Sequence, residues 1–148
     1  NSYNTAIGSR AMDTVTTGGS NVAVGFDSLG AITTASGSVI MGYQAGLNID
    51  SSNANVAIGY QALQEADANS DGTVAIGYKA GNAITSGEHN TFIGYNAGVL
   101  EQTGDNNVAI GYSAFDETSN ASSENVYIGV GAGGGDGLLK IHIRFRPP

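Results

Sequence analysis

The chain has 148 residues, of which 23 are glycine and none is cysteine, so no disulfide framework can form. Its formal net charge of −8 argues against binding to nucleic acid, which depends on lysine and arginine to neutralise phosphates. An acidic surface is instead typical of a soluble extracellular protein, and no apolar run reaches the roughly 18 residues that a membrane-spanning helix needs.

One short phrase, approximately Asn-Val-Ala-Ile-Gly-Tyr-x-Ala, recurs eight times, and successive copies are separated by 17 or 18 residues. A period this regular indicates a stack of similar supersecondary units. We assign residues 1–133 to this repeat domain and residues 134–148 to a glycine-rich exit followed by a C-terminal amphipathic strand. The glycines of the eight copies are Gly8, Gly25, Gly42, Gly59, Gly77, Gly94, Gly111 and Gly129.

Large apolar residues stand three and one positions before the glycine in most copies, as Val56 and Ile58 do before Gly59. Side chains at i and i+2 share one face of a strand, whereas a helix needs spacings of three and four and would be broken by the glycines. We expect both positions to point into the core. The pattern predicts an all-β fold, a parallel β-roll (β-solenoid) of eight coils of 17–18 residues.

The residue between those two positions points to the opposite face of the strand. It is alanine in five copies, and Ile40, Phe92 or Tyr127 in the other three. A face that met only water would carry polar residues, so we predict an inter-chain face at Ile40, Phe92 and Tyr127. Oligomerisation is also expected because a core of about three large side chains per coil is too thin for a lone chain.

Two further positions of the repeat have a physical interpretation. Asparagine precedes the strand in six copies, as at Asn21 and Asn55, and it suits a corner because it tolerates left-handed backbone angles. The residue after the glycine is aromatic in six copies, and stacked coils would place these rings about 4.8 Å apart in a ladder. The aromatic residues are Phe26, Tyr43, Tyr60, Tyr78, Tyr95 and Tyr112.

The phrase Asn-Val-Ala-Ile-Gly-Tyr, at residues 55–60 and 107–112, resembles the head repeat of YadA-like trimeric autotransporter adhesins. It is also similar to repeats in trimeric fibre proteins of bacteriophages. The resemblance covers residues 4–133, and it implies a left-handed parallel β-roll, a side-by-side homotrimer and adhesion as the activity. The period is longer here than in the best-known adhesin heads, which implies larger loops and an outer surface that need not be equivalent.

The segment from Asp67 to Gly72 has the oxygen-ligand spacing of a calcium loop, with Asp67, Asn69 and Asp71 as candidate ligands. The glutamate expected at the twelfth position of an EF-hand loop is replaced here by Tyr78. An ordinary acidic turn is therefore the alternative interpretation. Calcium is the one cofactor that the sequence suggests.

Catalytic patterns are absent from the sequence. The two histidines, His89 and His142, lie far apart and are not accompanied by a serine or cysteine pattern, so no triad or metal cluster is suggested. The glycines of residues 129–134 match a dinucleotide fingerprint in form, but no helix pattern follows them, and we interpret them as the exit from the roll. We predict that the protein is not an enzyme.

The C-terminal segment alternates cleanly between apolar and basic residues. Ile141, Ile143 and Phe145 share one face of the predicted strand, and Lys140 and Arg144 lie on the other. The strand either caps the roll of its own chain or adds to a neighbour as a subunit-joining strand, with its positive charge matching the acidic body.

Two functions are consistent with this fold. The first is a structural and adhesive extracellular fibre domain, a homotrimer that presents loops to a host-surface protein or glycan. The alternative is a self-assembling filament subunit, viral or cell-surface, that is mainly mechanical and is joined end to end by the C-terminal strand. Neither involves nucleic acid or membrane insertion by this segment. Because Asn1 already lies inside the first repeat, we expect the chain to be a segment of a longer protein.

Overall fold

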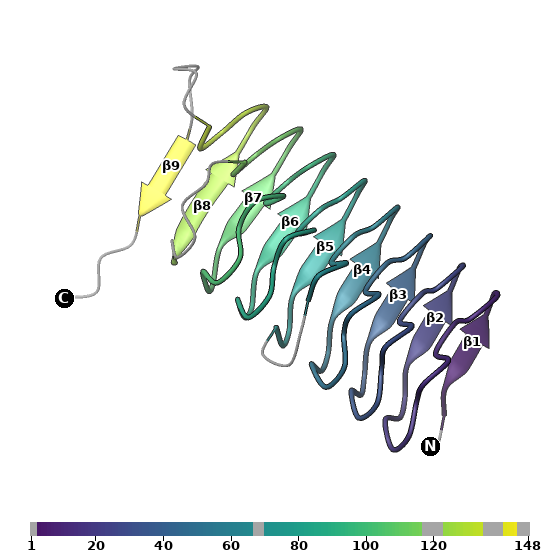
Figure 1. Cartoon of the computed structure of the whole chain (residues 1–148). Coiled ribbons are helices and arrows are strands. Elements are labelled where there is room, and N and C mark those ends of the chain that lie inside the picture. The colour runs from purple at the N-terminus through teal and green to yellow at the C-terminus, as the bar shows by residue number, and fades with distance from the viewer. Residues whose placement is uncertain (1–2, 67–69, 117–122, 135–140, 145–148) are drawn as a thin grey trace.

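The computed structural model describes residues 3–66, 70–116 and 123–134 in full, together with the backbone of residues 141–144. The chain winds into a β-solenoid in which each coil contributes one short strand to a single sheet (Figure 1). Eight parallel strands follow one another in chain order, and the described residues contain no helix. The prediction of an all-β parallel β-solenoid is therefore confirmed.

The eight parallel strands are very short, and a ninth strand pairs antiparallel with the eighth. Their bounds are β1 (Thr5–Ile7), β2 (Val22–Val24), β3 (Val39–Met41), β4 (Val56–Ile58), β5 (Val74–Ile76), β6 (Thr91–Ile93), β7 (Val108–Ile110), β8 (Asn125–Ile128) and β9 (Ile141–Arg144).

The parallel strands stack in register, because each residue pairs with its equivalent one coil further on, as Ile58 does with Ile76. The repeat glycines follow the strands as an aligned column, and all eight have φ between 130° and 139°. At Gly59 an added Cβ would lie 2.3 Å from the carbonyl oxygen of Gly77. Only glycine permits both this backbone angle and this approach, which explains why it recurs in every coil.

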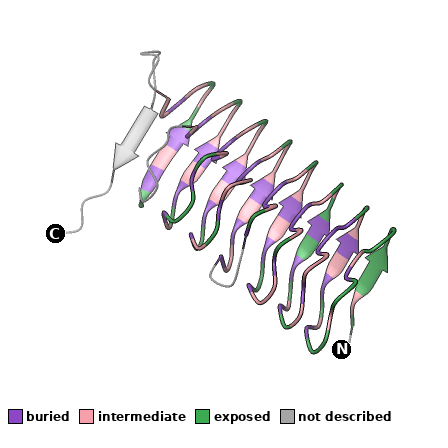
Figure 2. Ribbon diagram, in the orientation of Figure 1, coloured by how far each residue is buried: buried purple, intermediate pink, exposed green. Residues whose placement is uncertain are grey.

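The interior of the solenoid lies on the opposite side of the strands from the one that the sequence predicts. In β2 and in β4 to β7 the central residue is buried and its two neighbours are half-buried (Figure 2). Ile40 and Phe92 are fully buried within a single chain, and Tyr127 is 8% exposed. The predicted inter-chain face at Ile40, Phe92 and Tyr127 is therefore wrong, since these side chains form the core.

The physical reason is a volume exchange between two interior positions of each coil, in which one side chain is large where the other is small. In four of the five coils whose central strand residue is alanine, the residue four after the repeat glycine is large, as with Ala57 and Leu63. Where the central residue is large, that position is glycine, and a Cβ at Gly98 would lie 2.5 Å from the Phe92 ring. The fifth coil has two small residues, and there the Phe92 ring from the next coil covers Gly81. This compensation keeps the interior close-packed without a second chain.

A column of polar side chains at the corner before the strands joins each coil to the next. The backbone N–H of Ser38 donates to Oδ1 of Asn21 over 2.9 Å, and that of Thr73 donates to Oδ1 of Asn55 over 2.8 Å. All four residues are fully buried. The predicted corner position of asparagine is confirmed, but the predicted reason is wrong, because the left-handed angles lie at the preceding residues, such as Ser20. The side-chain oxygens instead replace carbonyl groups as acceptors for buried N–H groups.

The two ends of the sheet differ. At the C-terminal end β9 covers β8, with His142 opposite Tyr127 and Ile143 opposite Val126. At the N-terminal end all of β1 is exposed, which Figure 2 shows in green. Among the described residues nothing helical is long and apolar enough to cross a membrane.

Candidate interaction surface

The outward face of the sheet carries two columns of β-branched and other apolar side chains. One column runs from Thr5 to Val126 and the other from Ile7 to Ile128, with one member of each in every parallel strand. None of the residues in β1 to β8 is charged. Val39 is 37% exposed and Met41 is 40% exposed, although valine, isoleucine and methionine are normally among the most buried residues.

This apolar strand face extends along the whole parallel sheet. Strands of a sheet lie about 4.8 Å apart, so eight of them span roughly 34 Å along the solenoid axis. Contiguous apolar patches above a few hundred Å² generally mark sites of contact with another protein or with a membrane. The apolar strand face is therefore the candidate interaction surface of the molecule.

A column of aromatic rings follows the repeat glycines. Five successive ring pairs are stacked, with centroids 4.7–5.4 Å apart and planes inclined by 7–11°. The predicted ladder is thereby confirmed, and its aromatic residues are exposed, from Tyr78 at 38% to Tyr112 at 56% exposure. Cations extend over two of the rings, with Arg10 above Phe26 and Lys79 near Tyr78. We call Phe26, Tyr43, Tyr60, Tyr78, Tyr95 and Tyr112 the aromatic column.

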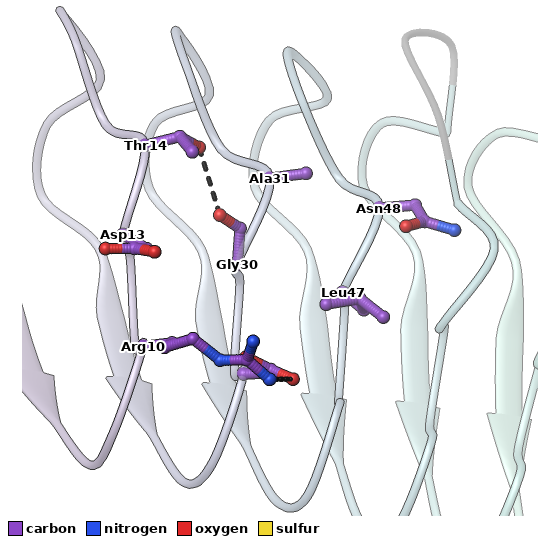
Figure 3. Close-up of a pocket in the computed structure, with 8 residues that line it drawn as sticks. Arg10, Asp13, Thr14, Gly30, Ala31, Leu47 and Asn48 are labelled. Carbon is purple, nitrogen blue, oxygen red and sulfur yellow. Dashed lines mark hydrogen bonds and ion pairs between the residues drawn. The ribbon is translucent and has the colours of Figure 1, made fainter.

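A shallow hollow of about 330 Å³ lies in the turns of the first three coils (Figure 3). The Arg10 guanidinium donates to the Asp27 carboxylate over 2.6 Å, and Thr14 Oγ1 donates to the carbonyl of Gly30 over 3.0 Å. Both polar groups are thus engaged by the next coil, so their visible role is to join coils. The hollow is lined by Arg10, Asp13, Thr14, Asp27, Gly30, Ala31, Leu47 and Asn48.

Asp71 is the one predicted calcium ligand that the structure describes, because Asp67 and Asn69 lie outside the described residues. Its Oδ1 accepts the backbone N–H of Asn53 over 2.6 Å. Within residues 3–66, 70–116 and 123–134, no three acidic, histidine or cysteine side chains gather as a metal site requires. The calcium site stays a prediction.

Glu101 is a buried carboxylate that sequence reasoning missed. It is fully buried at the position that Ile32, Ile49 and Ile84 occupy in other coils. Its Oε1 accepts the three successive backbone N–H groups of residues 102–104 at 3.0, 3.1 and 2.7 Å. In the first coil the equivalent N–H groups, those of residues 16–18, all donate to the carbonyl of Thr33 one coil further on. The carboxylate therefore accepts the bonds that a carbonyl of the following coil accepts in the first coil.

The remaining predicted site, the C-terminal strand, is partly visible. β9 pairs with β8 of its own chain, which places Ile141 and Ile143 in a capping strand, whereas Phe145 lies outside the described residues. His89 faces Glu88, with Nδ1 3.8 Å from a carboxylate oxygen. Comparison with family models, with curated proteins and with solved structures finds no match for this chain.

Proposed function

We propose that the protein is a structural and adhesive module of an extracellular fibre, in which copies of the chain associate side by side through the apolar strand face. The observation that carries this proposal is a face of uncharged strands on which Ile7, Val39, Met41 and Ile128 are 37–60% exposed, while the other outward valines and isoleucines are half-buried. Water contact with a surface of this kind is unfavourable by about 25 cal/mol per Å² of apolar area, so a partner that covers it is favoured.

The homotrimer is our preferred arrangement, and the resemblance of the repeat to heads of YadA-like adhesins and to phage fibres supports it. A partner copy suits this face because two copies have the same repeat period, so that equivalent side chains can lie opposite one another along the whole axis. The polar turns then remain on the outside, where they are available for attachment to a host protein or glycan. In this proposal the role is mechanical and adhesive and involves no catalysis.

Native mass spectrometry of the purified chain tests the association. We expect trimers from the wild type, and folded monomers or a large loss of trimer from the double variant Ile58→Asp/Ile76→Asp. The matched control is Leu100→Asp, because Leu100 is 41% exposed but lies in a turn outside the strands. A wild type that stays monomeric at micromolar concentration, or a double variant as trimeric as the control, would contradict the proposal.

A filament subunit is the second candidate function, and the edges of the sheet favour it. β1 has a neighbour on one side only, and so does β9, so both ends of the sheet expose strand edges that can pair with another chain. Electron microscopy separates the two candidates. Discrete rods indicate a fibre module, and filaments of indefinite length indicate a subunit that polymerises end to end.

A further inference from the structure

Five of the six rings in the aromatic column are tyrosines, and they are consecutive. From Tyr43 to Tyr112 the ring centroids are separated by 5.1, 5.2, 4.7 and 5.3 Å, with the planes nearly parallel. Each neighbouring pair comes from adjacent coils and is 17 or 18 residues apart in the chain. The ladder thus holds four pairs of phenol rings in contact, each linking one coil to the next.

These rings are also accessible to reagents in solution. Their exposed fractions lie between 38% and 56%, so the ring edges meet water although the faces are stacked. The two other described tyrosines provide a contrast. Tyr3 is 88% exposed but has no place in the ladder, and Tyr127 is 8% exposed and stacks on Phe115.

We propose that the aromatic column is a site of oxidative cross-linking, in which neighbouring tyrosines are joined as dityrosine and staple successive coils together. The oxidant is hydrogen peroxide acting through a haem peroxidase. Each of two phenols gives up one electron and its hydroxyl proton, and the peroxide takes up both electrons and both protons to become two molecules of water. The two phenoxyl radicals form a carbon–carbon bond between ring positions ortho to the oxygens. The hydrogens on those carbons then move to the oxygens and restore both phenols.

The geometry favours this coupling within one chain over coupling between chains. A radical formed on one ring already has a second phenol about 5 Å away, at an effective concentration far above that of any other molecule in dilute solution. Each bond closes a loop of one coil, and such a cross-link stabilises a fold by restricting the unfolded chain. The proposal does not depend on the oligomeric state or on adhesion.

The experiment treats the dilute wild-type protein with peroxidase and hydrogen peroxide. We expect dityrosine fluorescence, a denatured chain that still migrates as a single chain, and a mass lower by two hydrogen atoms for each bond. Peptide mapping should find bonds between neighbours in the column, such as Tyr60 to Tyr78. The melting temperature should rise after treatment.

The matched variant is Tyr60→Phe/Tyr95→Phe, which separates the remaining column tyrosines by phenylalanine. Phe26 already stacks on Tyr43 at 5.4 Å, so phenylalanine fits the ladder and the fold should be retained. We expect at least a tenfold loss of in-chain dityrosine in this variant, and no loss in the control Tyr3→Phe. Wild-type products that are absent, that join only different chains, or that map outside the column would overturn the proposal, and so would undiminished coupling in the double variant.

Discussion

The inward and outward faces of the strands follow opposite rules of residue size. The inward column is mostly alanine, as at Ala57 and Ala75, whereas the outward columns carry larger residues such as Val74 and Ile76. A coil of 17–18 residues encloses little space, so small side chains fill it once the turns contribute Leu63 and its equivalents. In a narrow solenoid, therefore, the size of an apolar side chain does not by itself show that the side chain lies in the interior.

The largest expected change in the free energy of unfolding comes from variants that test the volume exchange on the inward face. Phe92→Ala should lower the free energy of unfolding by about 3–5 kcal/mol, because it leaves a cavity in a close-packed interior. Adding Gly98→Leu should restore much of the loss, since it recreates the Ala57 and Leu63 pair of the fourth coil. Leucine tolerates this site because Leu63 has φ of 53°, close to the 61° of Gly98. Denaturant unfolding measures both variants, and the absence of any recovery would disprove the exchange.

The next effect concerns Glu101, the charged exception on the inward side. Glu101→Ala should lower the free energy of unfolding by about 1–3 kcal/mol, because the N–H groups of residues 102–104, of which that of Gly104 is buried, lose their acceptor. Glu101→Gln should cost less, since an amide oxygen can still accept these bonds without the charge. Equal stability of the alanine variant and the wild type, measured by thermal unfolding, would show that other acceptors replace the carboxylate.

The smallest expected changes in the free energy of unfolding come from two variants that compare the inward and outward faces of one strand. Ala75→Val adds two methyl groups to the inward face and should cost about 1–3 kcal/mol through overpacking. Val74→Ala removes two methyl groups from the half-buried outward face and should cost less than about 1 kcal/mol in the dissociated chain. Both are measured by denaturant unfolding at low protein concentration. A valine that stabilises the inward position would reverse our assignment of the faces.

The repeat period predicts most of the fold, because equivalent residues have to satisfy the same contacts in every coil. The glycine column, the three-residue strands and the aromatic ladder all follow from residues such as Gly59 and Tyr60 once the copies are aligned. Which face of the strands points into the core cannot be predicted in this way. A Val-Ala-Ile strand has two different faces, and the turns determine which of them lies inside the coil.

A signal for the correct choice was nevertheless present in the sequence. Ile40, Phe92 and Tyr127 are each followed by glycine six residues later, at Gly46, Gly98 and Gly133. A large residue paired with a glycine in this way indicates that the two share one confined space. The role of Glu101 could not be predicted, because a turn residue gives no sign that its side chain folds back onto the N–H groups of residues 102–104.

The backbone hydrogen bonds between coils join residues 15 to 19 positions apart. In a chain of 148 residues this corresponds to a relative contact order of about 0.12, which is low for an all-β protein and typical of faster-folding mixed domains. Once two coils have paired, the strand of each further coil pairs with an edge strand that is already formed, and only a short loop has to close. The protein should therefore assemble by propagation along its axis, and its rate of folding should change little when a coil is added or removed.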